Sequence, residues 1–161
     1  DQVVKDLVLT NIGLSGTLPS ELGLATKLER LRLASNPSLV GGLPSELGSM
    51  RSIEGISLVS SGISGSIPTE IGSLSRLKWL FLGESDLSGS IPSEIGDCQA
   101  LELLDFSLNP LTGTIPSQLR RLGNLTFLDL SRNQRFDRNP IPSDIWILRN
   151  LDTLLLAGIG F

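Results

Sequence analysis

Residues 77–100 read LKWLFLGESDLSGSIPSEIGDCQA, and residues 101–124 repeat the pattern as LELLDFSLNPLTGTIPSQLRRLGN. Both segments fit the formula LxxLxLxxNxLxGxIPxxLGxLxx. Six full units and a truncated seventh follow one another with spacings of 24, 25, 24, 24, 24 and 26 residues. They begin at Val4, Leu28, Ile53, Leu77, Leu101, Leu125 and Leu151. This repetition predicts a single repeat domain over residues 1–161.

The spacing of apolar residues within a unit predicts its local structure. The Leu-x-Leu alternation has the period of a strand, so the leucines face one way and the residues between them face the other. A single strand of this kind cannot bury its apolar face, whereas stacked units bury a continuous leucine column. The Gly-x-Ile-Pro step turns the chain, because glycine is conformationally free and proline fixes φ. We expect the xxLGxLxx segment to form a short helical turn on the convex side.

The ninth position of the unit predicts a hydrogen-bonded ladder. Asn36, Asn109 and Asn133 occupy it, and an asparagine side chain there can bond to the backbone of the turn. The equivalent places in the other units are taken by Ile12, Ser61, Ser85 and Ile159. We therefore expect a broken ladder and a softer solenoid than a strict consensus array would form.

These motifs resemble the plant-type leucine-rich repeats of receptor-like kinase ectodomains, receptor-like proteins and polygalacturonase-inhibiting proteins. The resemblance covers the whole chain. It implies an α/β repeat solenoid with a parallel concave β-sheet, short convex helical turns and a second sheet along one edge. It also implies an extracellular or cell-surface location, although the sequence contains no signal peptide.

The ends of the sequence depart from the family pattern. Family members usually carry cysteine-paired caps, and this sequence has none, so both ends of the leucine column are expected to be open. We interpret the chain as a fragment of a longer array. The alternative is an intact protein that self-associates through its uncapped ends.

Composition disfavours several classes of function. The net charge is -4 and the 13 Lys and Arg residues are scattered, which disfavours nucleic acid as a partner. No apolar run approaches the roughly 18 residues that a membrane span needs, so no membrane contact by this segment is predicted. The chain has no histidine, so Ser-His and Cys-His catalysis are excluded. We predict neither an enzyme nor a bound cofactor or metal, and we interpret the single cysteine, Cys98, as a small buried hydrophobe.

An apolar cluster marks the predicted concave face. Residues beside the strand leucines should project from that face, and Trp79, Phe81, Leu103 and Phe127 lie there on three successive strands. Three of the seven aromatic residues of the chain are in this cluster. An exposed apolar patch rich in aromatic side chains is typical of an interaction site. The alternatives are that a neighbouring segment covers it or that these positions vary without function.

Charges are separated along the same face. Arg30 and Arg32 lie on the second strand, whereas Asp105 and Asp129 lie on the fifth and sixth. A partner with complementary charges would be held in one orientation, although an ordinary solvated surface is the alternative. The two aspartates should lie side by side, where they could hold a cation, accept an arginine or act as a glycosidase acid pair. The open strand surface disfavours catalysis.

One further motif is a formal glycosylation sequon at Asn124-Leu125-Thr126. The same residues also fit the repeat consensus, so the motif has a structural alternative.

The leading hypothesis is a recognition module that binds a protein or peptide through its concave face, in an extracellular receptor or a secreted recognition protein. One alternative is an inhibitor or wall-associated protein that binds a polysaccharide-degrading enzyme or a glycan. The other is a structural or adhesive array that self-assembles.

Overall fold

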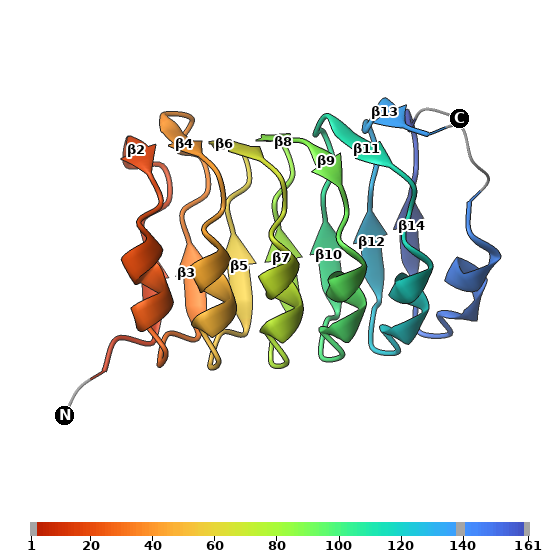
Figure 1. Ribbon diagram of the computed structural model, residues 1–161, viewed down its shortest axis with the longest axis horizontal. Coiled ribbons are helices and arrows are strands. Elements are labelled where there is room, and N and C mark those ends of the chain that lie inside the picture. The colour runs from red at the N-terminus through yellow and green to blue at the C-terminus, as the bar shows by residue number, and fades with distance from the viewer. Residues whose placement is uncertain (1–2, 138–140, 160–161) are drawn as a thin grey trace.

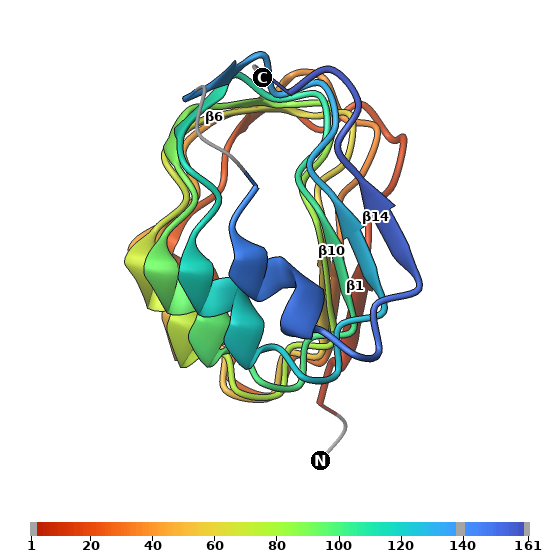
Figure 2. The same cartoon turned by 90° about the vertical axis from the view of Figure 1, so that its right-hand side faces the viewer.

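The computed structural model describes residues 3–137 and 141–159, in which each repeat forms one coil of a solenoid (Figure 1). Viewed along the solenoid, the main sheet lies on one side, short helices lie opposite, and two small sheets close the top (Figure 2). In the described residues the main sheet is parallel and seven-stranded. Its strands in order are β1 (Asp6–Val8), β3 (Arg30–Arg32), β5 (Gly55–Ser57), β7 (Trp79–Phe81), β10 (Leu103–Asp105), β12 (Phe127–Asp129) and β14 (Thr153–Leu155).

The leucine column fills the interior. The middle residue of each central strand points inward, and Leu31, Leu80, Leu104 and Leu128 are fully buried. Phe106 is buried in the same core. Because side chains of a strand alternate between its faces, the first and third residues of each strand of the main sheet lie on the concave surface. The predicted register is confirmed.

The second sheet implied by the family resemblance is present as two short parallel sheets. One contains β2 (Gly16–Thr17), β4 (Leu39–Gly41), β6 (Gly62–Gly65) and β8 (Asp86–Leu87). The other contains β9 (Gly89–Ser90), β11 (Leu111–Gly113) and β13 (Arg135–Phe136). The fourth repeat contributes β8 to one sheet and β9 to the other, so the division falls at Ser88.

The predicted convex turns are short 3₁₀ helices. They are η1 (Ser20–Leu24), η2 (Ser45–Ser49), η3 (Thr69–Ser73), η4 (Ser93–Asp97), η5 (Ser117–Arg121) and η6 (Ser143–Ile147). A proline precedes each helix, and its carbonyl accepts the first turn bond, as from the Ile71 N–H to the Pro68 oxygen at 3.2 Å. Glycine allows neighbouring helices to approach closely. A Cβ on Gly72, for example, would lie 2.5 Å from the Glu94 carbonyl oxygen.

The asparagine ladder forms as predicted. The Asn36 side-chain nitrogen donates to the carbonyls of Leu9 and Leu33, both at 2.8 Å, while its oxygen accepts the Leu14 N–H. Serine continues the polar column in the third and fourth repeats, where the Ser61 hydroxyl donates to the Leu58 carbonyl. Within the described residues no buried side-chain nitrogen or oxygen lacks a hydrogen-bond partner. The serines therefore shorten the ladder without leaving their own side chains unsatisfied.

Ion pairs just before the strands join the first repeat to the second and the third repeat to the fourth. Lys5 Nζ lies 2.8 Å from Glu29 Oε1. Glu54 pairs with both Lys78, at 3.0 Å, and Arg76, at 2.9 Å. Hydrogen bonds from Lys78 and then Arg76 lower the pKa of Glu54 below its ordinary value. These pairs fix one repeat against the next along the lower edge of the main sheet.

Candidate functional site

The concave surface brings the predicted apolar residues into two adjacent rows. Trp79, Leu103 and Phe127 are direct register partners on β7, β10 and β12. The second row is formed by Phe81, Asp105 and Asp129 on the same strands. Parallel strands in register thus place the aromatic and acidic candidates side by side, as the sequence predicted.

The indole of Trp79 lies across the neighbouring strand. Its register partner on β5 is Gly55, and a Cβ on Gly55 would lie only 1.8 Å from Cε2 of the indole. The ring therefore occupies the space above a residue without a side chain. It extends far enough to meet Arg32 of β3, whose guanidinium carbon is 5.5 Å from the ring centroid. A cation over an indole face is an attractive arrangement.

A shallow hollow follows from this arrangement. It is lined by Arg32, Ser57, Trp79, Phe81 and Leu103. The rings of Trp79 and Phe81 stack with centroids 5.6 Å apart and planes inclined by 25°. We name these five residues the aromatic hollow.

The apolar cluster is less exposed than predicted. Trp79, Phe81, Leu103 and Phe127 are all half-buried. The ring of Trp79 packs over β5 and against Phe81, which covers part of each ring. Phe127 lies two strands beyond Trp79 and does not line the hollow.

The two candidate arginines differ in their surroundings. Arg30 is paired with Asp6 on β1 through two hydrogen bonds, one of which joins Nη2 to Oδ2 at 2.8 Å. The hydrogen bond from Arg30 lowers the pKa of the Asp6 carboxyl, and Asp6 in turn raises the pKa of Arg30. Arg32 instead covers the Trp79 indole and is exposed. A ligand would have to compete with Asp6 for Arg30 but would find Arg32 at the margin of the hollow.

The paired aspartates are directly in register on β10 and β12. Each carboxylate accepts the backbone N–H two residues further on: Ser107 donates to Asp105 at 2.9 Å and Ser131 to Asp129 at 2.8 Å. These bonds fix one oxygen of each carboxylate toward its own turn. Within the described part of the chain, no group of three or more Asp, Glu, Cys or His residues could hold a metal ion.

The sequon lies at the edge where the strands begin. Asn124 is exposed, and its side-chain nitrogen donates to the Gln99 carbonyl at 3.0 Å. It lines a polar hollow together with Glu102, Thr126 and Arg149. Asn124 is therefore accessible while it also bonds to the preceding repeat.

Cys98 is buried, as predicted. Its thiol contacts the Ile71 carbonyl oxygen at 3.1 Å. Burial, followed by the charge of Asp97, raises the pKa of Cys98 to about 12. A thiol with so high a pKa is a poor nucleophile at neutral pH.

Comparison with known proteins supports the fold of the chain. Residues 100–122 match the family model described as Leucine Rich Repeat. Comparison with curated proteins gives no match. Among solved structures, the chain is similar to the leucine-rich-repeat ectodomain of the receptor kinase SOBIR1 from Arabidopsis thaliana, at 34% identity and a TM-score of 0.76, with 81% of this chain and 71% of that chain covered.

The chain belongs to the plant-type leucine-rich-repeat family. It is also similar to the Arabidopsis receptor kinase HAESA in complex with the peptide hormone IDA and the co-receptor SERK1, at 32% identity and a TM-score of 0.88, covering 97% of this chain and 26% of that chain. A third similar structure is the plant peptide hormone receptor RGFR1 in complex with RGF2, at 31% identity and a TM-score of 0.79, covering 92% of this chain and 27% of that chain. The chain thus spans about a quarter of the length of these two receptors. In the described residues, no helix has the length and apolar character that crossing a bilayer requires.

Two features of this leucine-rich-repeat chain lie away from the concave face, and the sequence predictions did not include the first. The helix position held by glycine in the first four repeats carries Arg120 and Trp146 in the next two. Arg120 lies 3.6 Å from Asp144 of η6, and Figure 2 shows η6 set apart from the stacked helices before it. Because a side chain here needs the space that the next helix otherwise fills, η6 does not stack in line. Trp146 occupies the same position in η6, the last helix of the described residues, and is 68% exposed.

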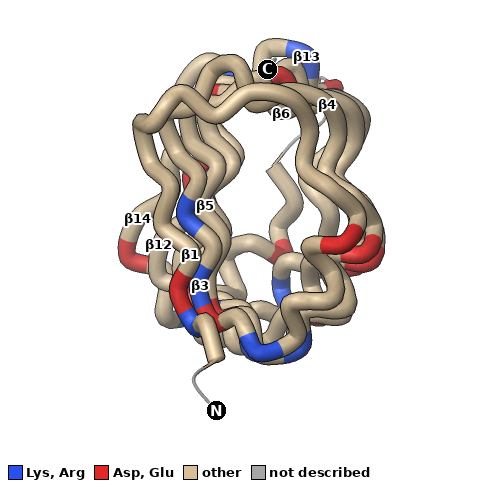
Figure 3. The backbone as a smooth tube through the Cα atoms, turned by 90° about the vertical axis from the view of Figure 1, so that its left-hand side faces the viewer, with Lys and Arg blue, Asp and Glu red and all other residues tan. Residues whose placement is uncertain are grey.

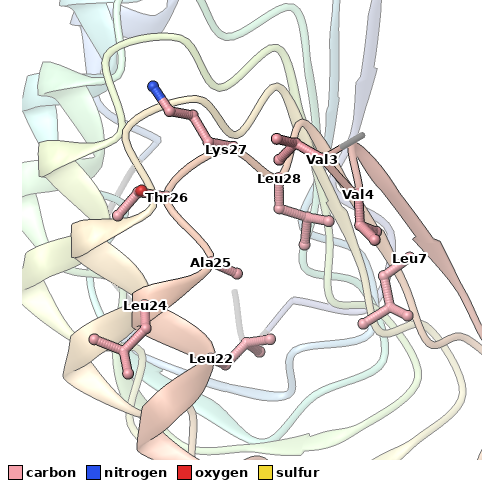
Figure 4. Close-up of a pocket in the computed structure, with 9 residues that line it drawn as sticks. All are labelled: Val3, Val4, Leu7, Leu22, Leu24, Ala25, Thr26, Lys27 and Leu28. Carbon is pink, nitrogen blue, oxygen red and sulfur yellow. The ribbon is translucent and has the colours of Figure 1, made fainter. Parts of the chain in front are cut away.

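The second feature is an apolar hollow at the N-terminal end of the leucine column. Figure 4 shows Leu7, Leu22 and Leu28, which are core positions of the repeat, beside Val3 and Val4. The lining is almost entirely apolar and lies at the end of the solenoid, away from the aromatic hollow. Acidic residues gather instead along the helix side (Figure 3), where η1 to η4 each carry a glutamate in the first turn.

Proposed function

We propose that the chain is a recognition module whose concave face binds an extended segment of a peptide or protein. It would act in an extracellular receptor or a secreted recognition protein. The observation that carries the proposal is the aromatic hollow, in which stacked Trp79 and Phe81 rings lie beside Leu103. The receptors HAESA and RGFR1, which resemble this chain, are complexes with peptides in their solved structures.

The size of the hollow limits what apolar contact can supply. Buried apolar surface contributes about 25 cal/mol per Å², and the apolar side chains of the hollow are already half-buried. Association costs about 4–15 kcal/mol in lost motional freedom. Apolar burial alone therefore gives weak binding, and polar contacts along the face are needed for affinity and specificity.

The charged residues supply such contacts in a fixed order. Arg32 on β3 and Asp105 on β10 are separated by three strand spacings, or about 14 Å. An extended peptide covers that distance with about four residues. The preferred partner therefore presents an acidic group near Arg32, an apolar side chain over the hollow, and a basic group near Asp105 and Asp129. Such an arrangement would hold the partner in one direction.

Affinity capture tests the proposal. The immobilised chain is exposed to extracellular fluid from plant tissue, and retained molecules are identified by mass spectrometry. The Trp79→Ala/Phe81→Ala variant removes both rings of the hollow, whereas Trp146→Ala removes a more exposed indole from the convex side. Far-UV circular dichroism checks that all variants keep the fold.

A peptide or protein retained by wild type and Trp146→Ala, but lost by the double variant, is the expected result. Equal retention by all three proteins would contradict a site on the concave face. A retained glycan would favour the wall-associated alternative, and retention of the chain itself would favour the self-assembling array.

We also propose that Asn124 carries an N-linked glycan when the chain is made in a secretory pathway. The exposed amide and the Thr126 hydroxyl two residues later support this assignment. Secreted protein should lose mass on treatment with an N-glycosidase, and Asn124→Gln should show no such loss. An unglycosylated secreted wild type would refute the assignment.

A further inference from the structure

From the contact between β5 and β7, we infer that Gly55 is the positioning residue of the aromatic hollow: the missing side chain at residue 55 lets the Trp79 indole lie across β5 and reach Arg32. The consequence for binding rests on the proposed function. The positioning itself rests on the geometry alone.

The first step is the shape of the gap. A Cβ on Gly55 would lie 1.8, 1.9 and 2.3 Å from indole atoms Cε2, Cζ2 and Cδ2 of Trp79. Real Cβ contacts are essentially never shorter than 3.0 Å. No other amino acid at residue 55 is compatible with this position of the ring.

The second step is the distance that the ring bridges. Arg32 is in register with Ser57 and Phe81, and β3 and β7 are separated by β5. Two strand spacings are about 10 Å, too far for direct contact between neighbouring side-chain positions. The 5.5 Å approach of Arg32 to the ring is possible because the indole crosses the intervening strand.

The third step is the choice of glycine. Glycine disfavours a strand, because it loses more backbone freedom on folding and offers no side chain to pack. Gly55 is nevertheless the first residue of a central strand and is buried. Its burial comes from the ring above it. A glycine at this place has a purpose when another group must approach the backbone closely.

The clash at residue 55 involves a side chain and not backbone. The indole can rotate away without moving β5 or β7, so an alanine at residue 55 should leave the solenoid folded while it displaces the ring. This differs from the convex glycines, where the atom that would be met is a backbone oxygen of the next repeat.

Tryptophan emission provides a test that needs no ligand. The chain has two tryptophans, so Trp146→Phe leaves Trp79 as the only one. In that background we compare the parent with Gly55→Ala and with Gly123→Ala. The second variant is the matched control, because a Cβ on Gly123 meets nothing within 4 Å. Acrylamide quenching measures how accessible the ring is.

Gly55→Ala should shift the Trp79 emission to longer wavelength and increase quenching by acrylamide, whereas Gly123→Ala should do neither. Far-UV circular dichroism and the unfolding midpoint should show that the solenoid remains folded. Unchanged emission and quenching in Gly55→Ala would overturn the inference.

The same variants connect the position of the ring to binding. Gly55→Ala should weaken retention of the captured partner on the order of tenfold, the loss typical of a central contact. In a Trp79→Ala background it should cause no further loss, because the ring through which it acts is absent. An equal loss in both backgrounds would overturn the positioning role. If the parent protein captures no partner, the proposed function fails, and the emission comparison still decides how Gly55 places Trp79.

Discussion

Asn109 is the residue at which the internal ladder can be tested most sharply. Its side-chain nitrogen donates to the carbonyls of Leu82, Phe106 and Ser107 at 2.9, 3.2 and 3.0 Å. Its oxygen accepts the Leu87 N–H at 2.9 Å. The side chain is only 3% exposed. One amide thus satisfies backbone groups of two neighbouring repeats.

Asn109→Ala should lower the free energy of unfolding by about 3 kcal/mol, because each net hydrogen bond contributes ~0.5–1.5 kcal/mol and a buried N–H is left without a partner. Asn109→Ser should cost less, about 2 kcal/mol, since a hydroxyl keeps one of these bonds. Ser61 shows how: its hydroxyl donates to the Leu58 carbonyl, three residues earlier, at 2.6 Å.

Urea unfolding followed by far-UV circular dichroism measures both differences. The order wild type, Asn109→Ser, Asn109→Ala in decreasing stability is the expected result. Equal stabilities for the serine and alanine variants would refute the reasoning, because the hydroxyl would then contribute nothing that the methyl group lacks.

Three further predictions concern the core, the ion pairs and the convex side. Cys98 should resist thiol reagents at pH 8 in the folded chain and react in urea, because burial raises its pKa to about 12; rapid labelling without denaturant would contradict this. Lys78 and Arg76 lower the pKa of the Glu54 carboxyl below 4.5, so the unfolded chain binds its proton at a higher pH than the folded chain, and the free energy of unfolding falls as the pH drops below 4.5. Glu54→Gln should therefore lose less stability in acid than wild type, and an identical pH profile would count against the ion pairs. Gly72→Ala should lower the thermal unfolding midpoint, because its Cβ would lie 2.5 Å from the Glu94 carbonyl oxygen, whereas Gly123→Ala, in open space, should leave the midpoint unchanged. Equal midpoints for the two variants would refute the claim that glycine is needed where neighbouring helices approach.

The architecture was predictable because the repeat specifies both the period and the facing of each strand. The Leu-x-Leu spacing placed Leu80, Leu104 and Leu128 inside and their neighbours outside, and the structure agrees. The convex segments were expected only as helical turns. Their 3₁₀ geometry depends on the backbone bond to the preceding proline carbonyl, which composition does not reveal.

The site was predictable in its rows but not in its contacts. Register alone placed Trp79, Leu103 and Phe127 together, whereas the burial of Trp79 depends on which way one ring turns. The sequence did indicate space for the ring, because Gly55 occupies the position of Trp79 in the preceding repeat. The pairing of Arg30 with Asp6 could also have been found, since opposite charges in direct register on neighbouring strands attract.

The convex side shows why position within the repeat must be read residue by residue. Arg120 and Trp146 fit the length of the repeat, yet they replace the glycine that lets consecutive helices stack. The displacement of η6 follows from the side chain of Arg120, which occupies the space between η5 and η6. Regular spacing alone would have predicted an unbroken stack.

A fluorine signal from each tryptophan tests the central claim, that the concave face is the binding surface, most directly. Trp146→Phe labelled with 5-fluorotryptophan reports only on Trp79, and Trp79→Phe labelled in the same way reports only on Trp146. On titration with the captured partner, the Trp79 resonance should shift or broaden while the Trp146 resonance stays unchanged. A response from Trp146 with none from Trp79 would place the partner on the convex side and contradict the account.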